Sequence, residues 1–284
     1  AMVQMLQDMR LKTDEQNQFL GDLFEGFLDQ GVKQNEGQFF TPTPITRFMI
    51  SALPLEQLIR DNTDIPRAID FACGAGHFLN EYAAQIKPYI EKYKGKEAIA
   101  DYFKQIFGIE KEYRLSKVSK VASFMYGQDG IQIIYGDALT DHSSRDIRPN
   151  SFKVLIANPP YSVSGFLATL SKEQRAEFEL NNYVDDKAIA TNNSIETFFV
   201  ERAKQLLVAD GIISIILPSS ILSNGNIYIK AREIILQYFD IIAISEFGSG
   251  TFGKTGTNTV VLFLRRKQDN PELVDVLRTR INAW

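Results

Sequence analysis

The chain has 284 residues, of which 44% are hydrophobic and 23% are charged, a balance that is typical of globular proteins and excludes collagen-like and disordered chains. Its 31 Lys and Arg residues stand against 35 Asp and Glu residues, and the net charge of −4 excludes a freestanding, uniformly basic nucleic-acid binder. No apolar run approaches the roughly 18 to 20 residues of a membrane span, so we expect a soluble, cytoplasmic protein with no membrane contact.

The N-terminal region, residues 1–62, is expected to be a helical extension. Apolar residues between positions 6 and 28 recur at helical spacing, and Gly31 provides a stop signal. A polar and aromatic loop follows, and Thr43-Pro44 can then cap and open a helix that runs to about residue 52. At the other end of the chain, residues 268–284 are expected to form a tail that is truncated.

Strands and helices alternate from residue 63 to residue 267, and we expect this region to be one α/β domain. Apolar runs predict strands at 68–72, 106–109, 131–135, 153–157, 211–217, 241–247 and 259–265. Helical spacing predicts helices at 77–93, 112–126, 193–209 and 228–238. The alternation implies a doubly wound, mostly parallel sheet, and the glycine-rich turn before the last strand implies that this strand pairs antiparallel. Ligands of such sheets bind beyond the carboxyl ends of the strands.

The first predicted strand ends in a glycine turn that leads directly into a helix. Gly74 and Gly76 permit a tight turn and close approach of a ligand, and Asp70 can accept hydrogen bonds from an amine. A dinucleotide fingerprint requires a third glycine where Leu79 stands, so a nicotinamide cofactor is disfavoured. Cys73 is the only cysteine, which excludes an intramolecular disulfide, and no Cys or His cluster around it suggests a metal site.

Acidic residues follow the second and third predicted strands. Glu110 stands where a ribose diol would lie against the glycine turn, and Asp137 could accept from the exocyclic amine of an adenine. Taken one at a time, both acids could equally be surface or capping residues. Their repetition at successive strand ends favours a shared binding crevice, because the carboxyl ends of neighbouring parallel strands converge.

The most informative motif is Asn158-Pro159-Pro160-Tyr161, which closes the strand predicted at 153–157. Two consecutive prolines cannot continue a ladder or enter a helix, so the strand must end there. The Asn158 side chain and the last carbonyls can accept two N–H groups of an exocyclic amine, and Tyr161 offers a ring for stacking. The motif therefore predicts a binding site for a planar amine, although on its own it could simply terminate a strand.

Together these motifs resemble the S-adenosylmethionine-dependent N6-adenine DNA methyltransferases. The resemblance rests on Asp70 with its glycine turn, on Glu110, on Asp137 and on the 158–161 motif, in this order. The loop at 37–42, Gly-Gln-Phe-Phe-Thr-Pro, is similar to that of the modification (M) subunits of type I restriction-modification systems and of related restriction-linked methylases. The resemblance covers about residues 17 to 267. Phe71 stands where the family commonly has proline, but the turn is intact.

This resemblance implies the Rossmann-like methyltransferase fold, with a catalytic domain at 63–267 and S-adenosyl-L-methionine as cofactor. The implied cofactor-binding residues are Gln38, Phe39, Phe40, Thr41, Pro42, Asp70, Ala72, Cys73, Gly74, Gly76, Glu110 and Asp137. The loop residues would border the methionine end, Ala72, Cys73 and Gly74 would offer backbone contacts, and Asp70 would lie near the amino group. The implied catalytic residues are Asn158, Pro159, Pro160, Tyr161 and Phe252.

The implied reaction is direct methyl transfer to an adenine that is flipped out of DNA, without a metal and without a strong base. Tyr161 would stack on one face of the base and Phe252 on the other. Phe252 could instead pack at the sheet edge. Likewise, Phe39 or Phe40 could pack in the core instead of bordering the cofactor. A separate specificity subunit and a restriction subunit are the implied partners. The alternatives are an RNA-base or protein-glutamine methyltransferase and a noncatalytic DNA-binding or scaffold subunit.

Overall fold

The computed structural model describes residues 41–248, 251, 257–269 and 272. The helix expected within residues 1–31, the loop residues Gln38, Phe39 and Phe40, and the aromatic Phe252 lie outside the described residues. The division of the chain at residues 62 and 267 therefore stays a prediction.

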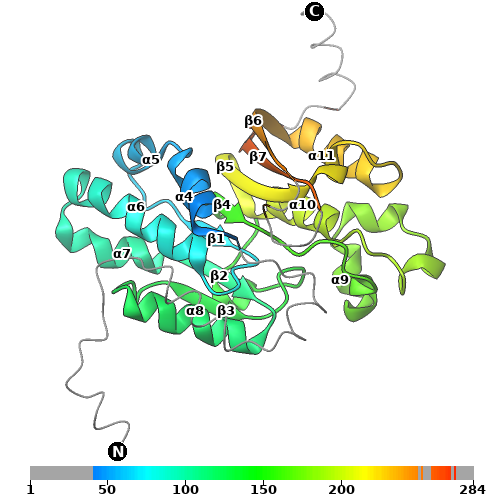
Figure 1. Ribbon diagram of the computed structural model, residues 1–284, viewed down its shortest axis with the longest axis horizontal. Helices are drawn as coiled ribbons and strands as arrows, with labels where there is room; N and C mark the ends of the chain where they lie inside the picture. Colours follow the sequence, from blue (N-terminus) through cyan, green and yellow to red (C-terminus); the bar gives the residue numbers. More distant parts are fainter. Residues whose placement is uncertain (1–40, 249–250, 252–256, 270–271, 273–284) are drawn as a thin grey trace, which may run out of the picture.

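The described residues form one sheet with the strand order β3-β2-β1-β4-β5-β7-β6 (Figure 1). Its strands are β1 (Ala68–Asp70), β2 (Ile106–Glu110), β3 (Gln132–Tyr135), β4 (Phe152–Ala157), β5 (Leu207–Pro218), β6 (Phe239–Phe247) and β7 (Thr259–Arg266). The first five pair in parallel, whereas β7 pairs antiparallel with both β5 and β6. The predicted mostly parallel sheet with an antiparallel last strand is confirmed.

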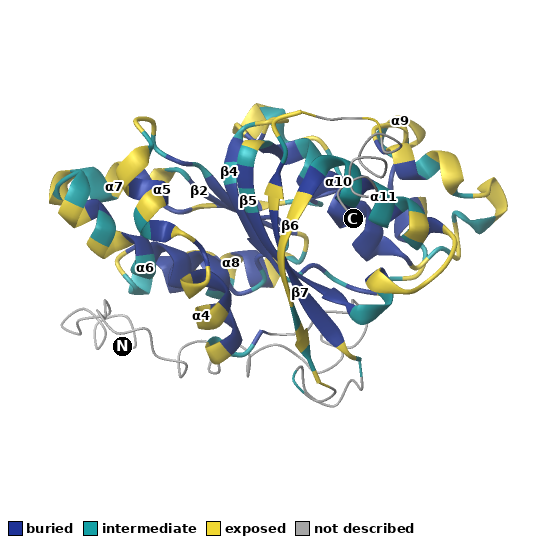
Figure 2. Cartoon of the chain, turned by 90° about the horizontal axis from the view of Figure 1, so that it is seen from above, coloured by how far each residue is buried: buried dark blue, intermediate teal, exposed yellow. Residues whose placement is uncertain are grey.

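Helices cover both faces of the sheet. Their bounds are α4 (Thr43–Ser51), α5 (Leu55–Asp61), α6 (His77–Tyr93), α7 (Ile99–Lys104), α8 (Tyr113–Met125), α9 (Lys172–Ala176), α10 (Ile195–Leu206) and α11 (Ile227–Tyr238). Alternate residues of β4 point to opposite faces, so Val154 and Ile156 pack with α4 to α7 while Leu155 and Ala157 pack with α10 and α11. The central strands are therefore buried on both sides (Figure 2).

Several segments differ from the predicted boundaries: β1 ends at Asp70 instead of residue 72, and β6 begins at Phe239 instead of residue 241. The helix predicted to residue 209 ends at Leu206, and β5 begins at Leu207 because that residue pairs with Phe152 across an irregular register. β6 lies at the edge of the sheet, and most of its residues are exposed, including Ile242 at 57% (Figure 2). Among the described residues, no helix combines the length and the apolar character needed to span a bilayer.

Candidate active site

The carboxyl ends of β1, β2 and β4 bring the predicted site residues to one edge of the sheet. β1 lies between β2 and β4, so Asp70 at the end of β1 has Glu110 on one side and the 158–161 motif on the other. β4 ends at Ala157, directly before the motif, as the two prolines predict. This neighbourhood is the edge at which ligands of parallel sheets bind.

The two turn glycines have different structural reasons. Gly74 has a φ of +51°, and a Cβ added there would meet nothing within 4 Å, so this side of the turn is open to a ligand. Gly76 has a φ of +87°, and a Cβ there would lie 2.4 Å from Ser119 Oγ of α8. Gly76 therefore allows α8 to pack closely against the start of α6, and the open surface of the turn is at Gly74.

Three successive backbone N–H groups of the turn already donate to other parts of the protein. Ala72 N donates to Asp70 Oδ1 (3.0 Å), Cys73 N to Ile109 O (3.0 Å) and Gly74 N to Glu110 Oε2 (2.8 Å). A ligand consequently meets the bare backbone at Gly74 rather than a row of N–H donors. The Cys73 thiol is buried, and burial raises its pKa well above the ordinary value, which argues against a nucleophilic role.

Asp70 carries the clearest electrostatic signal of the site. Its side chain is fully buried, and its Oδ2 atom has no hydrogen-bond partner among the residues that the structure describes. Burial raises the pKa of the Asp70 carboxyl to about 8, and the charge of Glu110 also raises it. A buried acceptor without a donor is costly, and a cationic or N–H donor brought to Oδ2 would stabilise the carboxylate. This orphaned oxygen fits the amino group of an amino-acid-like ligand such as S-adenosylmethionine.

Glu110 and Asp137 are both engaged by other parts of the chain. Glu110 is 5% exposed, and it ties β2 to the glycine turn by accepting from Gly74 N and from Glu112 N (2.7 Å). Asp137 Oδ1 accepts from Leu139 N (3.0 Å), while Oδ2 pairs with Lys111 Nζ at 2.9 Å. Because the Lys111 side chain is 55% exposed, this ion pair is weak and a ligand could displace it.

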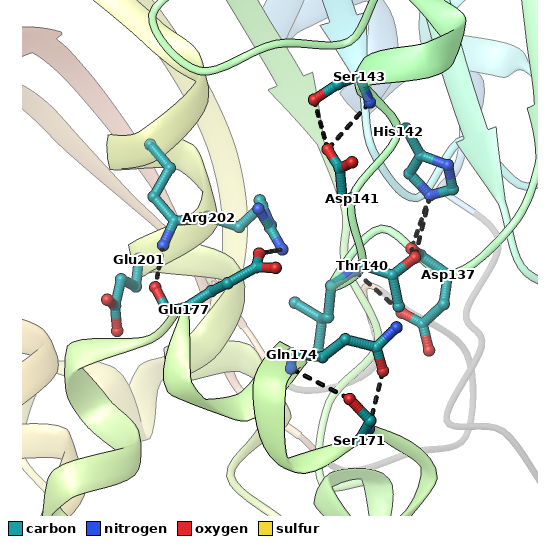
Figure 3. A network of polar contacts seen from close by, with 12 residues as sticks. Asp137, Thr140, Asp141, His142, Ser143, Ser171, Gln174, Glu177, Glu201 and Arg202 are labelled. Atoms are coloured by element: carbon teal, nitrogen blue, oxygen red, sulfur yellow. Dashed lines mark hydrogen bonds and ion pairs between the residues drawn. The ribbon is translucent and has the colours of Figure 1, made fainter.

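The loop that carries Asp137 is braced by its own polar contacts (Figure 3). The His142 ring nitrogen Nε2 lies 2.8 Å from Asp137 O, and Thr140 Oγ1 donates to the same carbonyl at 2.8 Å. The backbone of Asp137 is therefore held while its carboxylate remains 21% exposed. A ligand that donates a hydrogen bond to this carboxylate would meet a positioned acceptor.

Asn158 joins the end of the 37–42 loop to the motif. Its Nδ2 donates to Thr41 Oγ1 at 3.0 Å, and its Oδ1 accepts from the Tyr161 hydroxyl. Thr41, at the described end of the loop, thus lies beside Asn158 at the carboxyl edge of the sheet. The Tyr161 ring is 5% exposed and packs in the same apolar cluster as Ile156, so the structure buries the ring that was assigned to base stacking.

Glu196 is a residue of this site that the sequence did not single out. It is completely buried in the first turn of α10, where Oε2 accepts from Ser162 N (3.1 Å) and Oε1 accepts from the Tyr228 hydroxyl (2.6 Å). Ser162 follows the motif directly and has a φ of +54°. Burial and Glu196 together raise the pKa of Tyr228 to about 12, and the charge of Glu196 also raises the pKa of Tyr161. Glu196 therefore anchors the turn that leaves the motif.

We predict that Glu196→Ala lowers the free energy of unfolding by about 1 to 3 kcal/mol, because two buried donors lose their acceptor. The methyl transfer that the sequence resemblance implies should fall further than stability explains, since the turn after Tyr161 loses its anchor. Thermal unfolding and steady-state kinetics measure both effects. Glu196→Gln keeps an acceptor and should recover most of the loss, whereas equal activity in the wild type and Glu196→Ala would contradict the anchoring role.

The fold is shared with solved structures described as S-adenosylmethionine-dependent methyltransferases. A putative class I methyltransferase of this kind from Listeria monocytogenes has a TM-score of 0.59 with 16% identity, over 82% of this chain and 62% of that one. A modification subunit of a putative type I restriction enzyme from Vibrio vulnificus has a TM-score of 0.62 with 19% identity, over 88% of this chain and 47% of that one.

The chain belongs to the N-6 DNA Methylase family, which it matches over residues 15–280. It is 22% identical over 277 residues to the type I restriction enzyme EcoEI methylase subunit of Escherichia coli, covering 96% of this chain and 51% of that protein. It is 23% identical over 278 residues to the MpnII methylase subunit of Mycoplasma pneumoniae, covering 93% of this chain and 47% of that protein. The chain thus spans about half the length of these relatives, and the resemblance seen in the sequence is confirmed.

Proposed function

We propose that the chain transfers the methyl group of S-adenosylmethionine to N6 of adenine in DNA, as the modification component of a restriction-modification system. The observation that carries this proposal is the pairing of two groups at adjacent strand ends. Asp70 offers an orphaned carboxylate oxygen at the end of β1, and Asn158 offers an amide directly after β4. The first suits the amino group of the cofactor and the second suits the amine that is methylated.

The cofactor would lie across the ends of β1, β2 and β3. Asp70 Oδ2 would accept from its amino group, the open side of Gly74 would allow its close approach, and Glu110 would hold the ribose. Asp137 would accept from the adenine N6, with Lys111 displaced toward solvent. When bound, S-adenosylmethionine supplies a methyl group activated by a positively charged sulfur.

The residues after β4 would orient the acceptor amine. The Asn158 side-chain oxygen, which accepts from the Tyr161 hydroxyl in this structure, and the Pro159 carbonyl would be the two acceptors for the amine. Two N6–H groups held by these oxygens would direct the nitrogen lone pair toward the methyl carbon. Catalysis then comes from orientation and charge stabilisation, and the target adenine must first leave the duplex. Stacking of Tyr161 and Phe252 on the base completes this proposal.

DNA, RNA and protein acceptors incubated with methyl-labelled S-adenosylmethionine test this function. We expect label in DNA, recovered as N6-methyladenine after digestion and mass spectrometry. Label in RNA or in a glutamine side chain, with none in DNA, would contradict the proposal. Because its relatives are methylase subunits of type I restriction enzymes, we also propose that a separate specificity subunit selects the DNA sequence and that a restriction subunit joins the complex.

We predict that Glu110→Ala weakens cofactor binding by roughly ten-fold or more, because it removes both a ribose acceptor and the brace of the Gly74 N–H. Calorimetric titration with S-adenosylmethionine measures the effect. Glu112→Ala is the control, since Glu112 caps α8 through Leu115 N (2.6 Å). An unchanged affinity in Glu110→Ala would remove this residue from the site.

A further inference from the structure

A cavity of about 500 Å³ opens at the same edge of the sheet as the 158–161 motif. It lies between the residues that precede α10 and those that precede α11, with a third wall from residues 183–188. Both helices begin at the carboxyl edge of the sheet. α10 connects the parallel strands β4 and β5, and α11 follows the carboxyl end of β5. Asn158 and Tyr161 are not among the described residues that line this cavity, so it is separate from the proposed binding site for the amine.

Hydrogen bonds connect the cavity wall to the segment that follows Tyr161. Tyr228, a lining residue, donates to Glu196, and Glu196 accepts from Ser162 N. A second link runs from Gly165 N to Asn192 O at 2.9 Å, and Asn192 also lines the cavity. A ligand in this cavity would therefore contact residues that are hydrogen-bonded, directly or through Glu196, to the segment that follows Tyr161.

The lining chemistry is that of amides and phenol rings. The relevant side chains are Tyr183, Asn192, Asn193, Asn224, Asn226 and Tyr228. An asparagine amide presents a donor and an acceptor side by side, which matches the edge of a nucleobase, and tyrosine rings stack on bases. Among the described lining residues the only charged side chain is Asp185, whose negative charge disfavours a phosphate. These features favour an uncharged, planar, hydrogen-bonding ligand.

The mouth of the cavity is accessible to such a ligand. Tyr183 is 58% exposed, with the Lys230 ammonium 4.8 Å from its ring centroid, and both Asn193 and Asn224 are exposed. A volume of about 500 Å³ lies within the usual range of small-molecule sites. The exposed Tyr183 ring, the asparagine amides and the volume of the cavity are thus compatible with a single base and its sugar.

We propose that this cavity binds a nucleobase of the DNA substrate, next to the adenine that is presented to Asn158. This inference rests on the proposed function, since a DNA substrate must lie along this edge for a base to reach the cavity. It gives the chain a means of reading or holding the DNA beside its target, through neutral contacts that agree with the acidic overall charge.

Titration of uncharged 2′-deoxynucleosides tests the cavity directly, with S-adenosylhomocysteine added to saturate the cofactor site. Ligand-observed NMR should show saturable binding of at least one nucleoside, and Tyr183→Ala and Asn224→Ala should each weaken it roughly ten-fold, as loss of one stacking or amide contact implies. Asn182→Ala, an exposed asparagine outside the lining, is the matched control and should leave binding unchanged. Absence of nucleoside binding, equal binding in all variants, or binding of inorganic phosphate in its place would overturn the proposal.

Methylation kinetics separate this proposal from the proposed function. If the function holds and the cavity reads DNA, Asn224→Ala raises KM for DNA roughly ten-fold while kcat at saturating DNA and the affinity for S-adenosylhomocysteine stay near the wild type. A wild-type KM in Asn224→Ala would overturn the cavity alone. Failure of the proposed function has a different signature, namely no label in DNA and no binding of S-adenosylhomocysteine by the wild-type chain, and the nucleoside titration then still decides the cavity.

Discussion

Replacing Asn158 with alanine is expected to abolish methyl transfer while the affinity for S-adenosylmethionine stays near the wild type. The amide follows β4 directly, and its carbonyl oxygen is one of the two acceptors proposed for the adenine N6–H groups. Without it, the nitrogen lone pair is no longer directed toward the methyl carbon, and losses of 100-fold or more, about 3 kcal/mol of transition-state stabilisation, are typical for such groups. Single-turnover methylation and calorimetry measure the two quantities separately.

Thr41→Val is the matched control, because it removes only the hydroxyl that accepts from Asn158 Nδ2 and leaves the amide in place. We expect an intermediate loss of kcat from this variant. Retention of full activity by Asn158→Ala would contradict the assignment of the motif.

Tyr161 can be examined through the same assay, because its hydroxyl and its ring have different neighbours. Tyr161→Phe removes the hydrogen bond to Asn158 but keeps the ring in the apolar cluster, so the fold should persist. Tyr161→Ala should abolish methylation and also open a cavity in that cluster. If the ring stacks on the base, it must leave the cluster during the reaction, and the phenylalanine variant should retain more activity than the alanine variant.

Local patterns predicted the sheet well because each strand is a short apolar run bounded by turn residues. The run that precedes Asn158 became β4, and the run after Gly211 became the major part of β5. The start of β5 at Leu207 could not be predicted in this way, since it depends on pairing with Phe152, which is remote in the sequence. Pairing between distant segments prevails here over the helical spacing that predicts a helix to residue 209.

The residues of the candidate site were likewise predictable only where a local sequence pattern marks them. Asp70, Glu110 and Asn158 were recognisable because each stands at or directly after the end of an apolar strand, and parallel strands bring such ends together. Glu196 was not recognisable, because its partners Ser162 and Tyr228 come from other segments of the chain. The available signal was a carboxylate in the first turn of an apolar helix, which by itself indicates only a favourable helix start.

The stability of the ligand-free protein is expected to fall as the pH rises from about 4 to 8, and Asp70 is the cause. The carboxyl has a pKa of about 8 in the folded chain, against about 3.9 in an unfolded one. Between these values the folded state binds the extra proton, so the free energy of unfolding decreases by about 1.4 kcal/mol per pH unit from this group. Urea unfolding at several pH values measures the slope.

Asp70→Asn should remove this slope, since the amide does not titrate, whereas Asp64→Asn, at an exposed carboxylate, should leave it unchanged. The same Asp70→Asn change should weaken the binding of S-adenosylmethionine by at least roughly ten-fold, because the charged amino group then meets a neutral amide in place of a carboxylate. The two results are linked, because the burial that disfavours the ionised form of Asp70 also favours a cationic ligand beside it. An Asp70→Asn protein with an unaltered pH slope and full cofactor affinity would place both the buried charge and the amino group elsewhere.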